Sequence, residues 1–229
     1  MNINDLISGK IILINKDQGW SSFDVVNKIR IAIKKRFSIN KIKVGHAGTL
    51  DPLATGLLIL CTGKMTKKID NLSILNKKYI GIITLGATTP SYDCETEIDK
   101  TYPTNHITDQ MILSKANSFI GFNNQKPPIY SAIKKDGKRL YKYARAGEKV
   151  EIKARKIEIL EFNILKIEIP NIHFEILCSK GTYIRSIAKD FGERVHSGGY
   201  LSMLKRTEIG EYTIENASRV EDFIKNYLA

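Results

Sequence analysis

The sequence predicts a mixed α/β or α+β fold whose sheet is mixed or antiparallel. Runs of β-branched or alternating apolar residues come in clusters, and segments with helical apolar spacing lie between the clusters. A regular alternation of strand and helix, which would indicate a parallel sheet, is not the pattern here. The chain has 229 residues, 42% of them hydrophobic, which suffices for one large domain or two small ones.

The first part of the chain predicts two strands and a helix. Residues 11–15 (IILIN) predict a strand, and residues 21–37 predict a helix that Ser21 or Ser22 can cap. A glycine-rich loop then leads into LLILCT, at 57–62, whose continuous apolar run predicts a buried strand. The apolar face of the helix is expected to consist of Phe23, Val26, Ile29, Ile33 and Phe37.

The middle of the chain predicts further helices and one strand. A helix is expected to begin near Met65, and residues 79–86 (YIGIITLG) predict the next strand. An amphipathic helix over 108–120 is expected to end at Gly121. A shorter helix over 139–146 is expected to end at Gly147 in the same way.

The last part of the chain predicts strands followed by helices. Residues 156–169 and 172–179 alternate in the manner of strands, and residues 183–195 continue as a helix. Ser218 and Glu221 have the spacing of a capping box, which predicts a final helix that ends near residue 228.

The charge of the chain favours a polyanionic partner. There are 36 Lys and Arg residues against 24 Asp and Glu, a formal net charge of +12. Residues 126–156 alone hold 11 Lys and Arg against three acids, interleaved with Tyr130, Tyr141 and Tyr143. Cations for phosphates together with aromatic faces for bases suit RNA. The alternative is a solvated basic loop and helix with no ligand.

Several classes of protein lose support from motifs that are absent. No apolar run reaches membrane-spanning length, and the N-terminus lacks the pattern of a signal peptide. The three cysteines are widely spaced, so a disulfide framework is not expected and a reducing cytoplasm is the simplest location. The phosphate-loop pattern fails at Leu58 and Met65, and no GxGxxG occurs. The four histidines show no metal-ligand spacing, so no metal site is expected.

Three residues are candidates for chemistry. Asp51 lies on the glycine-rich loop directly before a proline, which restricts its backbone, so it is a candidate nucleophile or base. An aspartate of an Asx-turn is the alternative. His46 is five residues away and is a candidate to touch substrate. Arg185 falls in the first turn of a predicted helix, where the dipole disfavours a cation, so it is expected to have an anionic partner. A surface arginine is the alternative.

These segments together resemble one family, the bacterial tRNA pseudouridine synthases of the TruB type. The family's active-site loop reads roughly G-H-x-G-x-L-D-P-x-A-x-G, and residues 45–56 match it without a mismatch. Further matches are QKPPIYSAIKKDGKRLYKYARAG, CSKGTYIRSIAKDFGE and LKRTEIGEYTI. The segment KDQGWSSFDVV also matches, except that Asp17 stands where the family usually has proline. The resemblance spans about residues 10–217.

The resemblance implies an α+β pseudouridine synthase fold, a central, mostly antiparallel mixed sheet flanked by helices and loops. It implies that residues 1–229 form one catalytic domain without the C-terminal PUA-type domain common in the family. The implied reaction isomerises uridine 55, in the T-loop of tRNA, to pseudouridine, with no cofactor. The implied partner is the T-stem-loop of tRNA, with no obligate protein partner and no membrane. A non-catalytic tRNA-binding or tRNA-folding module, or a synthase for another RNA, are the alternatives.

The resemblance also assigns roles to individual residues. Asp51 matches the catalytic aspartate, and Arg185 would pair with it and hold it ionised. Tyr79 would stack on the flipped base, Tyr183 and Leu204 would line the pocket, and His46 would contact the RNA near the target. The basic segment becomes the expected RNA-binding surface, with the cations Lys134, Lys135, Lys138 and Arg139.

One loop departs from the family's pattern. After residues 79–86 the family usually has an Asp-Thr-x-Asp element and a following glycine. Here Pro90 and Ser91 replace its first two residues and Thr96 replaces the glycine, while Asp93 remains. This loop is therefore expected to be arranged in its own way.

Overall fold

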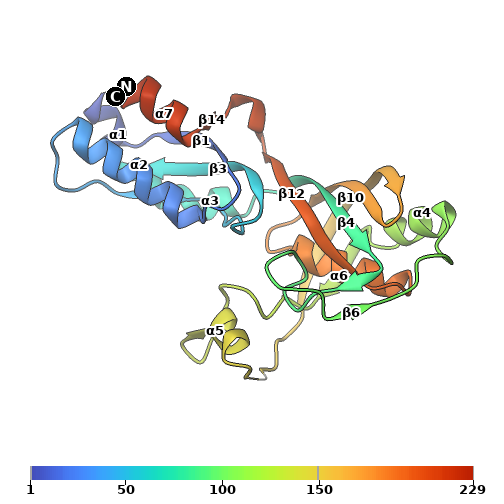
Figure 1. Cartoon of the computed structure of the whole chain (residues 1–229). Coiled ribbons are helices and arrows are strands. Elements are labelled where there is room, and N and C mark those ends of the chain that lie inside the picture. The colour runs from blue at the N-terminus through green and yellow to red at the C-terminus, as the bar shows by residue number, and fades with distance from the viewer. Residues whose placement is uncertain (1, 149, 229) are drawn as a thin grey trace. The chain divides into compact units, whose positions relative to one another are not determined.

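The computed structural model describes residues 2–148 and 150–228 (Figure 1). Two compact units make up the chain. Unit 1 comprises residues 1–79 and 204–229, and unit 2 comprises residues 80–203. The chain passes between the units within two strands, β4 (Lys77–Leu85) and β12 (Gly199–Ile209). Unit 1 is thus built from both ends of the chain.

Unit 1 holds a mixed sheet with strand order β14-β1-β3-β12. Strand β1 runs antiparallel to β3 and parallel to β14, and β12 runs parallel to β3. Short strands extend the sheet, β2 beside β3 and β13 beside β12. The bounds of these strands are β1 (Ile11–Lys16), β2 (Val44–His46), β3 (Thr55–Thr62), β13 (Tyr212–Thr213) and β14 (Ser218–Arg219).

Helices cover unit 1's sheet, and α2 packs against α7 (Figure 1). Both contribute to one apolar core with α1 and the strands, in which Ile14, Ile29 and Leu58 are fully buried. A second core includes Leu57 and Ile59, so β3 is buried on both faces, as its apolar run predicts. The helices are α1 (Ile3–Ser8), α2 (Ser22–Arg36), the 3₁₀ helix η1 (Gly63–Lys68), α3 (Ile69–Ser73), the 3₁₀ helix η2 (Ile214–Asn216) and α7 (Val220–Tyr227).

Unit 2 holds strands in the order β12-β4-β11-β10-β7. The long strands β10 and β11 form an antiparallel hairpin, and β7 pairs antiparallel with β10 at the edge. The rings of Phe119, Phe174 and Phe191 surround Phe162 and form its core. The elements are β5 (Ala87–Thr88), β6 (Lys100–Thr101), α4 (Asp109–Asn117), β7 (Gly121–Gln125), β8 (Lys134–Lys135), β9 (Lys138–Arg139), α5 (Leu140–Arg145), β10 (Arg155–Glu168), β11 (Asn171–Cys178) and α6 (Ile184–Arg194).

The predicted fold class is confirmed, because the sheet is mixed and most of its pairings are antiparallel. The predicted cap of α2 is also confirmed. Ser21 accepts a hydrogen bond from the Asp24 backbone, and the Asp24 carboxylate accepts one from the Ser21 backbone. Membrane-spanning length and apolarity are found together in no helix of the described ranges.

Four details of the predicted elements are wrong. Phe23 is 63% exposed, and Val25 takes its expected place in the core. Ser218 belongs to β14, so Arg219 rather than Ser218 precedes α7, with no side-chain cap. The helix expected near Met65 begins as the 3₁₀ helix η1 at Gly63. The helix α4 ends at Asn117, before the expected residue 120.

Candidate active site

Asp51 lies half-buried in the loop between β2 and β3, and the backbone around it is held from several directions. The Ala54 amide donates to the Asp51 carbonyl at 3.1 Å, which closes the turn through the main chain. Before Asp51, the Leu50 amide donates to the Ser22 hydroxyl at 2.8 Å, and that hydroxyl lies 3.1 Å from the Leu50 carbonyl. The sequence pattern 45–56 thus spans the end of β2, this loop and the start of β3.

Arg206 fixes the same loop from strand β12. Its side chain is only 1% exposed. Nε donates to the Leu57 carbonyl at 2.8 Å, and Nη2 and Nη1 donate to the carbonyls of Gly48 and Thr49 at 3.0 and 3.4 Å. The strand approaches so closely that a Cβ on Gly56, whose φ is +104°, would overlap the Arg206 backbone. One buried guanidinium therefore bonds carbonyls on both sides of Asp51.

Lys16 is a second buried cation beside the loop. It has no exposed surface, and its ammonium donates to the carbonyls of Trp20 at 2.7 Å, Asp17 at 3.1 Å and Pro52 at 3.4 Å. Burial lowers the pKa of Lys16 to about 8, while attraction to the Asp51 carboxylate opposes the shift. Lys16 therefore binds the backbone after Asp51 and places a positive charge that attracts the Asp51 carboxylate.

The other predicted residues of unit 1 lie on its strands. His46 is half-buried on β2, opposite Leu60 of β3. Burial, and then the charge of Arg206, lower the pKa of His46, so its ring is neutral at neutral pH. Tyr79 on β4 is 8% exposed, and Leu204 on β12 is half-buried.

Arg185 of unit 2 is buried, so the alternative of a surface arginine is wrong. The side chain is 4% exposed at the start of α6. Its guanidinium forms an ion pair with Asp93, from Nε to Oδ2 at 3.5 Å. Nη1 donates to the Ser91 carbonyl at 3.2 Å and Nη2 to the Tyr130 carbonyl at 2.9 Å. The expectation of an anionic partner is met by Asp93. The predicted pairing with Asp51 joins residues of different units and stays a prediction.

Tyr183 is held at the N-terminal end of α6 by a buried glutamine. The Gln125 side chain accepts from the Tyr183 amide at 2.8 Å and donates to its carbonyl at 3.0 Å. Arg155, which pairs with Gln125 in the sheet, places its guanidinium 5.9 Å from the centre of the Tyr183 ring. Gln125 thus fixes the backbone of a predicted substrate-binding residue.

The predicted RNA-binding cations gather on the two-stranded ribbon β8–β9. Lys134 lies opposite Arg139, and Lys135 lies opposite Lys138. Like charges in such cross-strand positions repel each other. Lys138 is partly neutralised by Glu148, at 2.7 Å, and Lys135 donates to the Glu151 carbonyl. Lys149, which belongs to the predicted basic segment, lies outside the described residues.

Four residues of this site escaped prediction or were given no role, namely Lys16, Asp93, Gln125 and Arg206. Each makes its contacts with residues far away in sequence or with the backbone, so spacing carries no signal for them. A lysine or arginine inside an apolar strand pattern is the one available hint. Within the described ranges, no three His, Cys, Asp or Glu side chains are grouped so that they could hold a metal.

Comparison with known proteins places this chain in a family. The model of the TruB family pseudouridylate synthase (N terminal domain) matches residues 34–184. The tRNA pseudouridine synthase B of Flavobacterium johnsoniae is 54% identical over 218 residues, 95% of each chain. That of Parabacteroides distasonis is 47% identical over 224 residues, 96% of this chain and 95% of the relative.

Solved structures agree with the fold. A chain in the crystal structure of a Cbf5-Nop10-Gar1 complex is similar, with a TM-score of 0.71 and 25% identity. The similarity covers 97% of this chain and 55% of that one, so this chain spans about half of that chain's length. Its sequence match and its structural similarity show that the chain belongs to the TruB family of pseudouridylate synthases.

Proposed function

We propose that this protein converts uridine to pseudouridine in tRNA, at position 55 of the T-loop, with Asp51 as the nucleophile. Membership of the family supports the isomerisation, and two relatives named tRNA pseudouridine synthase B match over 95% of their length. The observation that carries the role of Asp51 is the way its loop is held. Side chains of Ser22, Lys16 and Arg206 form hydrogen bonds to backbone carbonyls on either side of Asp51. Such fixed positioning is what a nucleophile requires.

The reaction is an isomerisation, so the product has the same atoms as the substrate apart from protons exchanged with water. The C1′–N1 bond breaks, the uracil turns, and a C1′–C5 bond forms. The hydrogen on C5 leaves as a proton, and N1 gains a proton. Asp51 would attack either the base or C1′ of the ribose, and both routes fit the proposal. The role of Arg185 would be to pair with Asp51 and orient its carboxylate.

The target uridine has to leave the base stack before Asp51 can reach it. Unstacking costs a few kcal/mol, which a pocket must offset. Tyr79, Tyr183 and Leu204 would line this pocket, and His46, neutral at neutral pH, would contact the RNA nearby. Both units, residues 1–229, would together form the catalytic domain.

The ribbon β8–β9 would bind the phosphates of the RNA backbone. Its facing pairs place like charges together, an arrangement that a phosphate would relieve. The T-stem-loop of tRNA is the proposed partner, no obligate protein partner is included, and the cytoplasm is the proposed location. A reducing compartment suits the three free cysteines, Cys61, Cys94 and Cys178.

A tritium-release assay tests the proposal. The substrate is an unmodified tRNA T-arm, and then full-length tRNA, labelled at C5 of its uridines. Wild type should release tritium, Asp51→Asn should release none while its tRNA affinity stays within a few-fold, and the exposed-acid control Asp70→Asn should behave as wild type.

Turnover by Asp51→Asn would refute the assignment of Asp51 as the nucleophile. Binding without release from any tRNA would indicate a tRNA-binding or tRNA-folding module. Tritium release from another RNA only would indicate a pseudouridine synthase with a different RNA substrate.

A further inference from the structure

Two of the three replaced positions of loop 88–97, Ser91 and Thr96, belong to one hydrogen-bonded cluster within unit 2. The Ser91 and Thr96 hydroxyl oxygens lie 2.9 Å apart. The Ser91 amide donates to the Thr96 hydroxyl at 3.1 Å, and the Thr96 amide donates to the Ser91 hydroxyl at 3.3 Å. Two positions at which this chain departs from its family are therefore direct, reciprocal partners.

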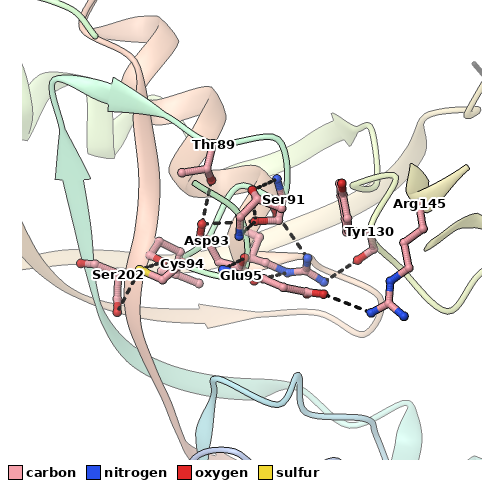
Figure 2. Close-up of polar contacts among 11 residues, drawn as sticks. Thr89, Ser91, Asp93, Cys94, Glu95, Tyr130, Arg145 and Ser202 are labelled. Atoms are coloured by element: carbon pink, nitrogen blue, oxygen red, sulfur yellow. Dashed lines mark hydrogen bonds and ion pairs between the residues drawn. The ribbon is translucent and has the colours of Figure 1, made fainter. Parts of the chain in front are cut away.

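The cluster holds the segment that faces Arg185. The Thr89 hydroxyl donates to the Asp93 carbonyl at 2.7 Å, and the Ser91 hydroxyl lies 3.2 Å from the same oxygen (Figure 2). The Glu95 amide donates to Asp93 Oδ1 at 2.9 Å. Asp93 is buried, and hydrogen bonds hold both its carbonyl and its carboxylate.

The loop supplies two of the groups that hold the Arg185 guanidinium. They are the Ser91 carbonyl, at 3.2 Å, and the Asp93 carboxylate, at 3.5 Å. Another is the Tyr130 carbonyl, from the basic segment (Figure 2). A shift of the loop would therefore move two of these partners of a buried cation together.

The conformation of the loop needs such support. Tyr92, between Ser91 and Asp93, has a φ of +64°, in the left-handed region that is unfavourable for a residue with a Cβ. Hydrogen bonds on both sides of it offset this cost. Because the Ser91 hydroxyl bonds to Thr96 and lies close to the Asp93 carbonyl, the pair spans the strained residue.

We propose that Ser91 and Thr96 act as a pair of positioning residues that fix loop 88–97 and, through it, the orientation of the Arg185 guanidinium. The pair is this chain's replacement for the family's Thr and Gly at those positions. Its effect on catalysis rests on the proposed function, in which Arg185 orients Asp51. The pair itself touches neither substrate nor Asp51 in this proposal, so it should change turnover rather than RNA affinity.

The test is a double-mutant cycle with Ser91→Ala, Thr96→Val and the double variant, read by tritium release from full-length tRNA. Each single change should lower kcat by about 5- to 10-fold and leave KM within two-fold, and the double variant should be no worse than the singles. Thr96→Ser keeps the hydroxyl and should retain the wild-type kcat. The matched control is Thr88→Val, which removes a hydroxyl bonded to Asp99 and outside the pair.

A second readout does not depend on activity. The exchange rate of the Arg185 Nε hydrogen, assigned by its loss in Arg185→Lys, should rise at least five-fold in Thr96→Val and stay unchanged in Thr96→Ser. If the losses of kcat multiply in the double variant, or if the exchange rate is unchanged in Thr96→Val, the proposal that Ser91 and Thr96 act as a positioning pair is wrong. An inactive wild type with the expected exchange rates would instead refute only the proposed function.

Discussion

The guanidinium of Arg206 donates to the carbonyl oxygen of Gly48 at 3.0 Å across 158 positions of sequence. The same side chain bonds the Leu57 carbonyl, after Asp51, at 2.8 Å. A side chain that spans a loop in this way restricts the loop more than a local turn does, because both ends are fixed to one rigid strand.

Replacing Arg206 should destabilise unit 1. Arg206→Met removes the donor from the buried Leu57 carbonyl and from the partly buried Gly48 carbonyl. A buried acceptor without a donor costs about 1–3 kcal/mol, so we expect a loss of roughly 3 kcal/mol in the free energy of unfolding. Arg206→Lys should lose less, because one donor remains. Urea denaturation measures the change, with Lys205→Met, one position earlier on the same strand, as the control. A loss below about 0.5 kcal/mol in Arg206→Met would contradict the role given to this contact.

Gly56→Ala should be far more harmful than a glycine replacement in a similar backbone conformation. A Cβ at Gly56 would overlap the Arg206 backbone, whereas Gly137, with φ +78°, has nothing within 4 Å of such a Cβ. We expect Gly137→Ala to cost about 1 kcal/mol, the backbone term alone. Gly56→Ala should cost several kcal/mol or prevent folding. Equal thermal stabilities of the two variants would show that the close approach does not matter.

Lys16 should make stability depend on alkaline pH. Its folded pKa, about 8, lies below the ordinary lysine value of 10.5, so the unfolded state binds more protons between these values. The contribution of Lys16 therefore destabilises the fold below about pH 8 and is relieved as the pH rises. The free energy of unfolding of wild type, relative to Lys16→Met, should rise by roughly 2 kcal/mol between about pH 7 and 9.5. A flat difference across this range would mean that Lys16 is not held as a buried ammonium.

The ribbon β8–β9 should control the salt dependence of RNA binding. Neutralising Lys134, Lys135 and Lys138 together should weaken binding and flatten the slope of log K against log salt. The structure sharpens this expectation, because Lys138 is already paired with Glu148. Lys134→Gln with Arg139→Gln should lower the slope by about 1.5, and Lys138→Gln by less than about 0.5. An unchanged slope in the double variant of Lys134 and Arg139 would indicate that the RNA binds to another surface.

Much of the fold could be predicted because its signals are local. The helix α2 carries a complete capping box at Ser21 and Asp24, and β3 is a continuous apolar run. Where local signals compete with tertiary contacts, the prediction fails. Ser218 has the spacing of a cap, yet it pairs with Ile14 in the sheet. Phe23 fits the apolar stripe of α2, yet it faces solvent, 63% exposed, with Arg30 above its ring.

The site was predictable only as far as its residues share short motifs. Asp51 and His46 fall in one loop, whereas Lys16 and Arg206 reach that loop from distant strands. The strand β12, which carries Arg206, was not predicted at all, because its buried positions include a charged residue and do not alternate. A fully buried arginine contradicts the usual hydrophobic pattern and is recognisable only when its three carbonyl acceptors are in view.

The construction of unit 1 from both ends of the chain has a consequence for synthesis. The ribosome delivers residues 1–79 first, and then the whole of unit 2, before it delivers β12 beyond residue 204, β14 and α7. At about 5–20 residues per second, this delay lasts roughly 6–25 s. Throughout it the nascent N-terminal sheet lacks a neighbouring strand and the loop around Asp51 lacks Arg206, so this loop is among the last parts of the protein to take its final form.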